Sequence, residues 1–336
     1  MSVTDTSPTA AGETSAPLLE ISNLAKHFEM RAGALKLTRL VLKAVDDVSF
    51  SLQRGETLCL VGESGCGKST VGKLILRLME PSAGAIRIDG DDVTHAGGAA
   101  LRQFRRRVQM IFQDPFASLN PHLNAGTIVG EPLENYNLYN ARERREQVAA
   151  LFARVGLRPE AAAKFPFEFS GGQRQRIGIA RALALSPDLI VADEPVSALD
   201  VSVQAQVLNL LVDLRDQLGL AYLFISHDLG VVEHIAHRVA VMYLGRIVEI
   251  GDKRTIFSRA QHPYTQALIA AAPVADPRVK RDAIVIEGDV PSPLDPPKGC
   301  AFHTRCPFAF ARCSQETPLL TRRGDGHLAA CHLDMP

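Results

Sequence analysis

The chain has 336 residues, of which 46% are hydrophobic and 22% are charged, as is usual for a folded soluble protein. Its 37 Lys and Arg residues balance 37 Asp and Glu residues, and this neutrality argues against a bulk nucleic-acid binder, which would be basic. At about 100–200 residues per domain, the length suggests two domains or one large domain with an appendage. No apolar run approaches the roughly 18 residues that would indicate a membrane span.

Residues 1–17 are rich in Ser, Thr, Ala and Pro, without the positively charged start and apolar stretch of a secretory signal. They are predicted to form a disordered lead-in, and the missing signal favours the cytosol. A nucleotide-binding domain is predicted over residues 18–260. Residues 261–336, with many prolines in their first half, are predicted to form a separate C-terminal region.

The chain order of apolar patterns predicts an α/β domain. Residues 18–21 and 45–52 are predicted strands around a less ordered basic stretch at 31–43. Continuous apolar runs at 58–61, 189–192 and 222–225 are typical of buried parallel strands. Helices are predicted after Lys68 and from residue 203, and a hairpin over 239–250. Helical segments over about 114–169 are expected as an insertion.

Residues 62–69, GESGCGKS, match the phosphate-loop pattern G-x-x-x-x-G-K-[ST] between a predicted strand and a predicted helix. Glycines let backbone N–H groups surround phosphate oxygens, and the following helix directs its positive end at them. Lys68 is expected to reach the β- and γ-phosphates and Ser69 to ligate Mg²⁺. The predicted nucleotide-binding residues of this segment are Gly62, Glu63, Ser64, Gly65, Cys66, Gly67, Lys68, Ser69 and Thr70. Cys66 is interpreted as a tolerated small residue, not a redox switch.

Two carboxylates, Asp193 and Glu194, end the second buried strand. Asp193 is positioned to reach Mg²⁺ directly or through water, as P-loop ATPases require. Glu194 is the candidate general base for the attacking water. The alternative, a pair of solvated carboxylates, is disfavoured by the phosphate loop upstream.

Four further motifs accompany these two in a fixed order. Gln113 closes a strand-like run, Ser-Gly-Gly-Gln at 170–173 precedes a long amphipathic stretch, residues 197–200 follow Glu194, and His227 follows the third strand. Over residues 20 to about 250 this set resembles the ATP-binding cassette subunit of ABC transporters. The resemblance implies a P-loop NTPase fold with a RecA-like core, an antiparallel β subdomain and a helical subdomain, followed here by a small cysteine-containing appendage.

The resemblance also implies roles for individual residues. Phe28 is expected to stack on adenine, Gln113 to touch Mg²⁺ or water and sense membrane subunits, and His227 to act as the switch histidine. The signature (Ser170, Gly171, Gly172, Gln173) and Asp200 of the following loop are expected at the nucleotide. Because the signature lies too far along the surface to reach its own phosphate loop, two cassettes are expected to enclose two ATP molecules. The expected catalytic set is Glu194, His227, Lys68 and Gln113, and the expected Mg²⁺ ligands are Ser69, Gln113 and Asp193.

Segments at 112–121, 197–206, 245–251, 262–265 and 291–307 resemble the dipeptide/oligopeptide importer ATPases of the DppF/OppF type. This resemblance implies a different second cassette subunit, two membrane permease subunits and an extracytoplasmic peptide-binding protein, at the cytoplasmic face of the inner membrane and without nucleic acid. Residues 114–121 are expected to face the membrane subunits, although Phe116 and Leu119 are alternatively local core. Phe167 departs from the family pattern, in which a polar residue, commonly His, is expected.

Three other functions are alternatives to peptide import. The same ATPase would serve an importer of nickel or another small solute. A soluble ABC ATPase of translation or DNA repair is disfavoured, because such chains carry two cassettes or a coiled-coil insertion. A redox-regulated binding module is disfavoured by the intact Glu194.

Four of the six cysteines, Cys300, Cys306, Cys313 and Cys331, lie near the C-terminus and include no C-x-x-C pair. Four thiols in a proline-rich segment suggest a metal that stabilises it. The resemblance points to a [4Fe–4S] cluster, which is the predicted third cofactor beside ATP and Mg²⁺. Zinc, with His303 or His332, and unligated thiols remain the alternatives.

Overall fold

The computed structural model describes residues 16–32, 38–272, 286 and 288–333. Residues 1–15 of the predicted lead-in lie outside this part of the chain, as do residues 273–285. Among the described residues, no helix has both the length and the apolar character needed to cross a membrane.

An eight-stranded sheet forms the centre of the molecule, in the order β11-β12-β10-β9-β3-β8-β7-β6. The five strands from β9 to β6 are parallel to one another, and β10, β12 and β11 continue the sheet in antiparallel pairs. Their bounds are β3 Thr57–Val61, β6 Val108–Ile111, β7 Leu189–Asp193, β8 Ala221–Ser226, β9 Arg238–Tyr243, β10 Arg246–Asp252, β11 Thr321–Gly324 and β12 His327–Ala329.

The three predicted apolar strands are β3, β7 and β8, and every residue of each is buried. Successive side chains of a strand point to opposite faces of its sheet. Accordingly, Leu58 and Leu60 of β3 belong to one hydrophobic cluster, whereas Cys59 and Val61 belong to the other. Both faces of the central strands are covered, which explains why their sequences are continuously apolar instead of alternating.

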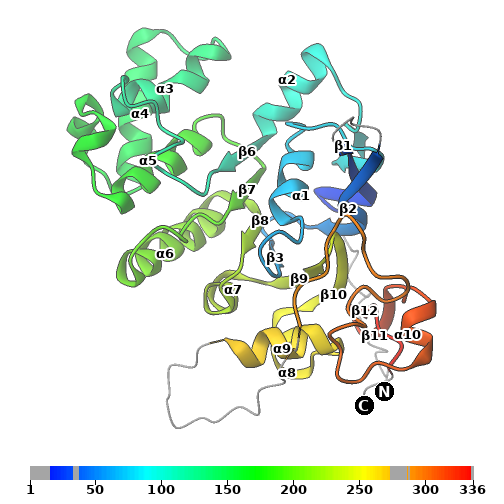
Figure 1. The fold of residues 1–336 in the computed structure, drawn as a ribbon. Helices are drawn as coiled ribbons and strands as arrows, with labels where there is room; N and C mark the ends of the chain where they lie inside the picture. The colour runs from blue at the N-terminus through cyan, green and yellow to red at the C-terminus, as the bar shows by residue number, and fades with distance from the viewer. Residues whose placement is uncertain (1–15, 33–37, 273–285, 287, 334–336) are drawn as a thin grey trace, which may run out of the picture.

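Ten α-helices are described, with two short 3-10 helices between α4 and α5. Figure 1 shows α3, α4 and α5 grouped on the side of the molecule away from β1 and β2. The bounds are α1 Lys68–Ile75, α2 Gly98–Arg107, α3 Ala125–Asn135, α4 Ala141–Arg154, η1 Pro159–Ala163, η2 Pro166–Glu168, α5 Gly171–Leu183, α6 Val201–Leu218, α7 Leu229–Ile235, α8 Lys253–Arg259, α9 Pro263–Ala271 and α10 Ala311–Gln315. The predicted helical insertion at 114–169 contains α3, α4, η1 and η2.

A second, antiparallel sheet has the order β2-β1-β4-β5. Its bounds are β1 Leu19–Ala32, β2 Thr38–Leu52, β4 Ala83–Ile88 and β5 Asp91–Asp92. The stretch at 31–43 is predicted to be less ordered. Residues 33–37 lie outside the described residues, and for the described part the prediction is wrong, because β1 and β2 pair up to Ala32 and Thr38. Pairing between strands satisfies the backbone groups there, and a local sequence pattern does not report it.

The C-terminal region is joined to the main sheet rather than appended to it. β12 pairs with β10, so the hairpin β11–β12 extends the sheet by two strands. The fully buried carboxylate of Glu249 lies 2.7 Å from His327 Nε2 and accepts the backbone N–H groups of Gln261 and His262. A buried carboxylate with three such partners fixes the region on the sheet.

Candidate functional site

The predicted phosphate loop connects β3 to α1. Gly62 and Gly67 have φ values of 150° and 108°, which side-chain-bearing residues rarely adopt. A Cβ atom on Gly62 would overlap the Met242 carbonyl oxygen, and one on Gly67 would overlap the Ala44 carbonyl oxygen. No side chain caps the first turn of α1, and no acidic residue lies in it. The first turn of α1 therefore presents backbone N–H groups that no side chain caps, together with a positive helix end, as an anion site requires.

Lys68 and Cys66 have different environments inside this loop. The buried Lys68 ammonium donates to the carbonyl oxygens of Gly62 at 2.7 Å and Glu63 at 2.9 Å, so it lies within the loop curve. Burial raises the pKa of the Cys66 thiol even though Lys68 is near. A protonated, buried thiol is a poor nucleophile, which supports the interpretation of Cys66 as a tolerated small residue.

Ser69 and Asp193 meet beside the loop. The Ser69 hydroxyl donates to Asp193 Oδ1 at 2.9 Å, and only 5% of Asp193 is exposed. Burial raises the pKa of Asp193, while the hydrogen bond from Ser69 opposes that shift. A hydroxyl and a carboxylate are the hard oxygen donors that Mg²⁺ prefers, so this pair fits the predicted metal.

Glu194 lies between two other predicted catalytic residues. Its Oε1 is 3.0 Å from His227 Nδ1, and its Oε2 accepts Gln113 Nε2–H at 2.9 Å. Glu194 has a left-handed backbone, with φ of 45°, and its N–H donates to the Ile225 carbonyl of β8. This strained conformation, held by the neighbouring strand, fixes where the carboxylate lies.

These residues converge because the strands that carry them are neighbours. β6, β7, β8 and β3 are adjacent and parallel, and the segments that follow them carry Gln113, Glu194, His227 and the phosphate loop. Ligands of open α/β sheets bind outside the carboxyl ends of the strands. The arrangement places a carboxylate able to take a proton beside a loop able to bind phosphate.

The remaining predicted residues lie elsewhere. Ser170 and Gln173 form a reciprocal capping box at the exposed N-terminus of α5, and Gly171 and Gly172 begin that helix. α5 and α1 lie well apart in Figure 1. Asp200 is exposed at the start of α6 without a side-chain capping bond. Phe28 is half-buried on β1, with the Lys26 ammonium 5.3 Å from its ring centroid. Ser64, Gly65 and Thr70 complete the loop and the first turn of α1.

Two residues from the C-terminal region reach the loop, and the sequence analysis did not assign them a role. The Tyr264 hydroxyl accepts the Glu63 N–H at 2.9 Å, and Arg305 Nη1 lies 3.0 Å from Glu63 Oε2. Both lie in segments used only for the family resemblance, and no spacing pattern connects either of them to Glu63.

The segment predicted to face membrane subunits is only partly exposed. Phe116 is 61% exposed, with the Arg174 guanidinium 3.9 Å from its ring centroid, whereas Leu119 is 2% exposed. Local core is therefore the correct interpretation for Leu119 but not for Phe116. Phe167, the departure from the family pattern, is 70% exposed and stacks on Phe165. Arg174 also donates to the Phe167 carbonyl oxygen at 3.3 Å, so Phe116 and Phe167 lie near the same guanidinium, and their two exposed rings are here called the exposed aromatic patch.

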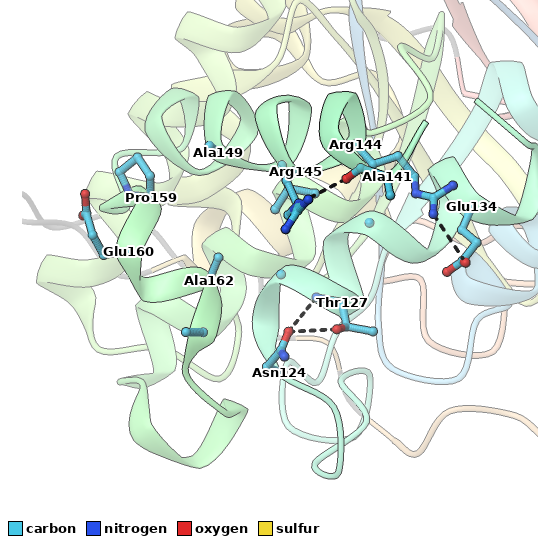
Figure 2. Close-up of a pocket in the computed structure, with 14 residues that line it drawn as sticks. Asn124, Thr127, Glu134, Ala141, Arg144, Arg145, Ala149, Pro159, Glu160 and Ala162 are labelled. Atoms are coloured by element: carbon cyan, nitrogen blue, oxygen red, sulfur yellow. Dashed lines mark hydrogen bonds and ion pairs between the residues drawn. The ribbon is translucent and has the colours of Figure 1, made fainter. Parts of the chain in front are cut away.

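A cavity of about 640 Å³ lies within the helical segment. Figure 2 shows its lining from α3, α4 and η1, with Arg144 paired to Glu134 and Asn124 bonded to Thr127. None of the predicted catalytic or nucleotide-binding residues lines it. The cavity therefore gives no support to a second chemistry on this chain.

The predicted [4Fe–4S] cluster is wrong. All four C-terminal cysteines are described, and no group of three or more His, Cys, Asp or Glu in the described part of the chain is arranged to hold a metal ion. Burial raises the pKa of Cys300 to about 11 and also raises the pKa of Cys306 and Cys331, which favours thiols over the thiolates that bind metal. The zinc alternative fails for the same reason, and free thiols remain.

Comparison with known proteins identifies families that this chain resembles in sequence and fold. Residues 45–197 match the family model described as ABC transporter, and residues 248–313 match the oligopeptide/dipeptide transporter C-terminal region. The dimeric, post-hydrolysis structure of the ATP-binding cassette MJ0796 with ADP and Pi has a TM-score of 0.62 and 28% identity, covering 70% of this chain and 99% of that one. The cbiO1 structure from Clostridium perfringens also has a TM-score of 0.62, at 25% identity, covering 72% and 91%.

Relatives extend over nearly the whole chain. The probable peptide ABC transporter ATP-binding protein y4tS of Sinorhizobium fredii is 56% identical, covering 95% of this chain and 90% of its own. The oligopeptide transport ATP-binding protein AppF of Bacillus subtilis is 53% identical, covering 94% and 97%. The dipeptide transport ATP-binding protein DppF of Haemophilus influenzae is 51% identical, covering 95% and 97%. The protein therefore belongs to the family of ATP-binding proteins of peptide ABC transporters.

Proposed function

We propose that this chain hydrolyses ATP to drive uptake of dipeptides or oligopeptides, from the cytoplasmic face of the inner membrane. The observation that carries the chemistry is the placement of Glu194 between Gln113 and His227, at the same sheet edge as the phosphate loop. The family relationship supports the transport role. The names of the relatives favour a peptide cargo over nickel or another small solute.

Each residue contributes a separate part of hydrolysis. The loop N–H groups and Lys68 bind and orient the phosphates, and Ser69 and Asp193, with Gln113 nearby, would hold Mg²⁺. When bound, Mg²⁺ neutralises charge on the phosphate oxygens. Glu194 accepts a proton from the attacking water, and His227 orients the Glu194 carboxylate. Phe28 supplies a face for adenine.

The exposed signature points to a second cassette as partner. In the described part of the chain, Ser170 and its neighbours present a helix N-terminus that forms no hydrogen bond with the phosphate loop. A helix N-terminus binds anions well, so it suits the γ-phosphate of ATP on another subunit, with Asp200 at the same interface. We infer a heterodimer with a different ATPase subunit. The solved cassette MJ0796, which is dimeric, supports pairing in general.

The membrane partners are inferred from the exposed aromatic patch. Phe116 and Phe167 are large apolar side chains that the described residues leave open to solvent, and such surfaces mark interaction sites. Two permease subunits are the inferred occupants, with an extracytoplasmic peptide-binding protein completing the importer. Residues 114–121 then transmit movement from Gln113 to the permease.

A trapped complex tests the proposal. The tagged Glu194→Gln chain, held with ATP and Mg²⁺ in detergent-solubilised native membranes, is expected to co-purify with two polytopic membrane chains and a second cassette. The binding protein that joins this complex would then be assayed with labelled peptides and with Ni²⁺. Recovery of ribosomal or DNA-repair proteins without membrane chains would contradict transport while leaving ATP hydrolysis in place.

A further inference from the structure

Glu63, the second residue of the phosphate loop, is held by two residues that lie about 200 or more positions further along the chain. The Tyr264 hydroxyl, from the start of α9, accepts the Glu63 N–H at 2.9 Å. Arg305 Nη1 lies 3.0–3.3 Å from both Glu63 carboxylate oxygens, and Arg305 Nη2 lies 3.3 Å from Oε1. Backbone and side chain of one loop residue are therefore both fixed by the C-terminal region.

Both partners of Glu63 are themselves held in place. Tyr264 is fully buried, and its ring lies 4.7 Å from that of Tyr243 and 5.4 Å from that of Phe302. Phe302 is 1% exposed and lies three residues before Arg305, whose side chain is 9% exposed. Arg305 also lies 3.4 Å from the Tyr243 hydroxyl. Packed aromatic rings leave these two side chains little freedom, so the contacts act on a defined loop geometry.

The Arg305 guanidinium and the Glu63 carboxylate carry opposite charges, so their contact affects the electrostatics of the loop as well as its packing. A carboxylate inside a loop that binds polyphosphate repels its ligand unless a cation neutralises it. Burial alone would lower the pKa of Arg305, but hydrogen bonds to Glu63 and Tyr243 raise it overall, so the guanidinium stays charged. Only 26% of the Glu63 side chain is exposed, so solvent screens the carboxylate less than it would a surface group.

We propose that Arg305 and Tyr264 are positioning residues for ATP binding: the C-terminal region neutralises and holds Glu63, and thereby sets the affinity of the phosphate loop for nucleotide. The inference rests on the proposed function of the loop. It gives the C-terminal region a role in the ATPase itself, although that region lies outside the phosphate loop and the catalytic residues.

A double-mutant cycle tests this proposal in the full-length chain. Mg²⁺-ATP and Mg²⁺-ADP titrations would be measured for the unmodified chain and for Arg305→Met, Glu63→Gln and the Arg305→Met/Glu63→Gln double variant. Arg305→Met leaves an unpaired carboxylate in the loop and is expected to weaken ATP binding about tenfold. Because ADP carries less charge than ATP, the same substitution is expected to weaken ADP binding less. The double variant has no unpaired charge and is expected to bind ATP within about threefold of Glu63→Gln alone.

Three further variants separate positioning from general stability. Tyr264→Phe removes only the hydroxyl and is expected to weaken ATP binding about fivefold, the usual weight of one hydrogen bond. Arg305→Lys keeps the charge and is expected to restore most of the affinity. His327→Gln loosens the same region at Glu249, away from the loop, and is expected to lower the thermal midpoint without changing ATP affinity.

The outcomes are distinguishable. If Arg305→Met lowers the thermal midpoint but binds ATP as the unmodified chain does, the contact is structural and the proposal fails. If the double variant shows no rescue, the electrostatic account fails. Should Arg305→Met not fold, Tyr264→Phe decides, and unchanged ATP affinity in that variant overturns the proposal. Failure of the unmodified chain to bind ATP would instead refute the proposed function of the loop.

Discussion

Replacing Glu194 by Gln is expected to stop hydrolysis while ATP still binds. A general base contributes about 10²–10⁴-fold to a rate, which corresponds to roughly 2.7–5.4 kcal/mol in the activation free energy. The substitution keeps the size of the side chain. Its amide oxygen can still accept one of the two N–H groups that Glu194 now faces, from Gln113 and His227.

The size of the fall in turnover distinguishes removal of a general base from a change in the position of neighbouring side chains. Losing one hydrogen bond costs about 1 kcal/mol, which amounts to roughly a fivefold change. Phosphate release by the reconstituted transporter, at saturating Mg²⁺-ATP, is therefore expected to fall at least a hundredfold, with the Kd for ATP within about fivefold of the unmodified value.

Glu233→Gln, on the exposed face of α7, is the matched control and is expected to leave turnover and ATP affinity unchanged. A fall in turnover of only fivefold or less in Glu194→Gln would show that the carboxylate orients its neighbours and takes no proton. That result would refute the assignment of Glu194 as the base.

Three further predictions test other parts of the site and fold. In Gly67→Ala the added Cβ atom would overlap the Ala44 carbonyl at φ of 108°, so ATP affinity should fall at least tenfold in titrations. The control Gly90→Ala places its Cβ atom in open space and should lower the unfolding free energy by about 1 kcal/mol, through backbone strain alone. Phe116→Ala should spare unfolding free energy but reduce permease recovery, whereas Leu119→Ala should destabilise the chain by about 2–5 kcal/mol in urea titrations. Burial raises the pKa of Asp46, but hydrogen bonds from Arg246 and His27 outweigh burial and hold that pKa below 3.8. The ionised Asp46 therefore stabilises the fold above pH 3.8, and this stabilisation is lost as pH falls through the folded-state pKa. Asp46→Asn should accordingly reduce the loss of unfolding free energy at acidic pH, as measured in a pH series of urea titrations.

The sheet edge that carries Glu194 and His227 can be predicted from the sequence, because the apolar runs that form its strands are visible as short local patterns. The apolar runs at 58–61, 189–192 and 222–225 are short and uninterrupted, and parallel neighbours bring their carboxyl ends to one edge. Residues placed directly after those strands, such as Glu194 and His227, must then lie close together. Their meeting within 3.0 Å follows from the sheet order rather than from any pattern near either residue.

Features that depend on pairing between distant segments were not predicted. β12 has three residues, too few for a recognisable alternation, and its place beside β10 depends on contacts such as that between His327 and Glu249. The four C-terminal cysteines show that residues close in sequence need not converge in space. Thiols that are close in sequence predicted a shared metal, but ligation requires that the sulfur atoms converge on one point, and spacing alone does not determine where each side chain points.

The phosphate loop is held from two sides, and this suggests how the two parts of the chain act on one another. On one side Ser69 contacts Asp193, at the sheet edge that carries Glu194, the proposed base. On the other side the Gly245 N–H, from the β9–β10 turn, donates to the Cys66 carbonyl at 2.9 Å, and Arg305 holds Glu63. β10 in turn pairs with β12 of the C-terminal region. A displacement of Arg305 would therefore reach the loop through the Glu63 contact, so nucleotide affinity should respond to it before the proton-transfer geometry of Glu194 does. His327→Gln acts at Glu249 and leaves the Glu63 contact in place.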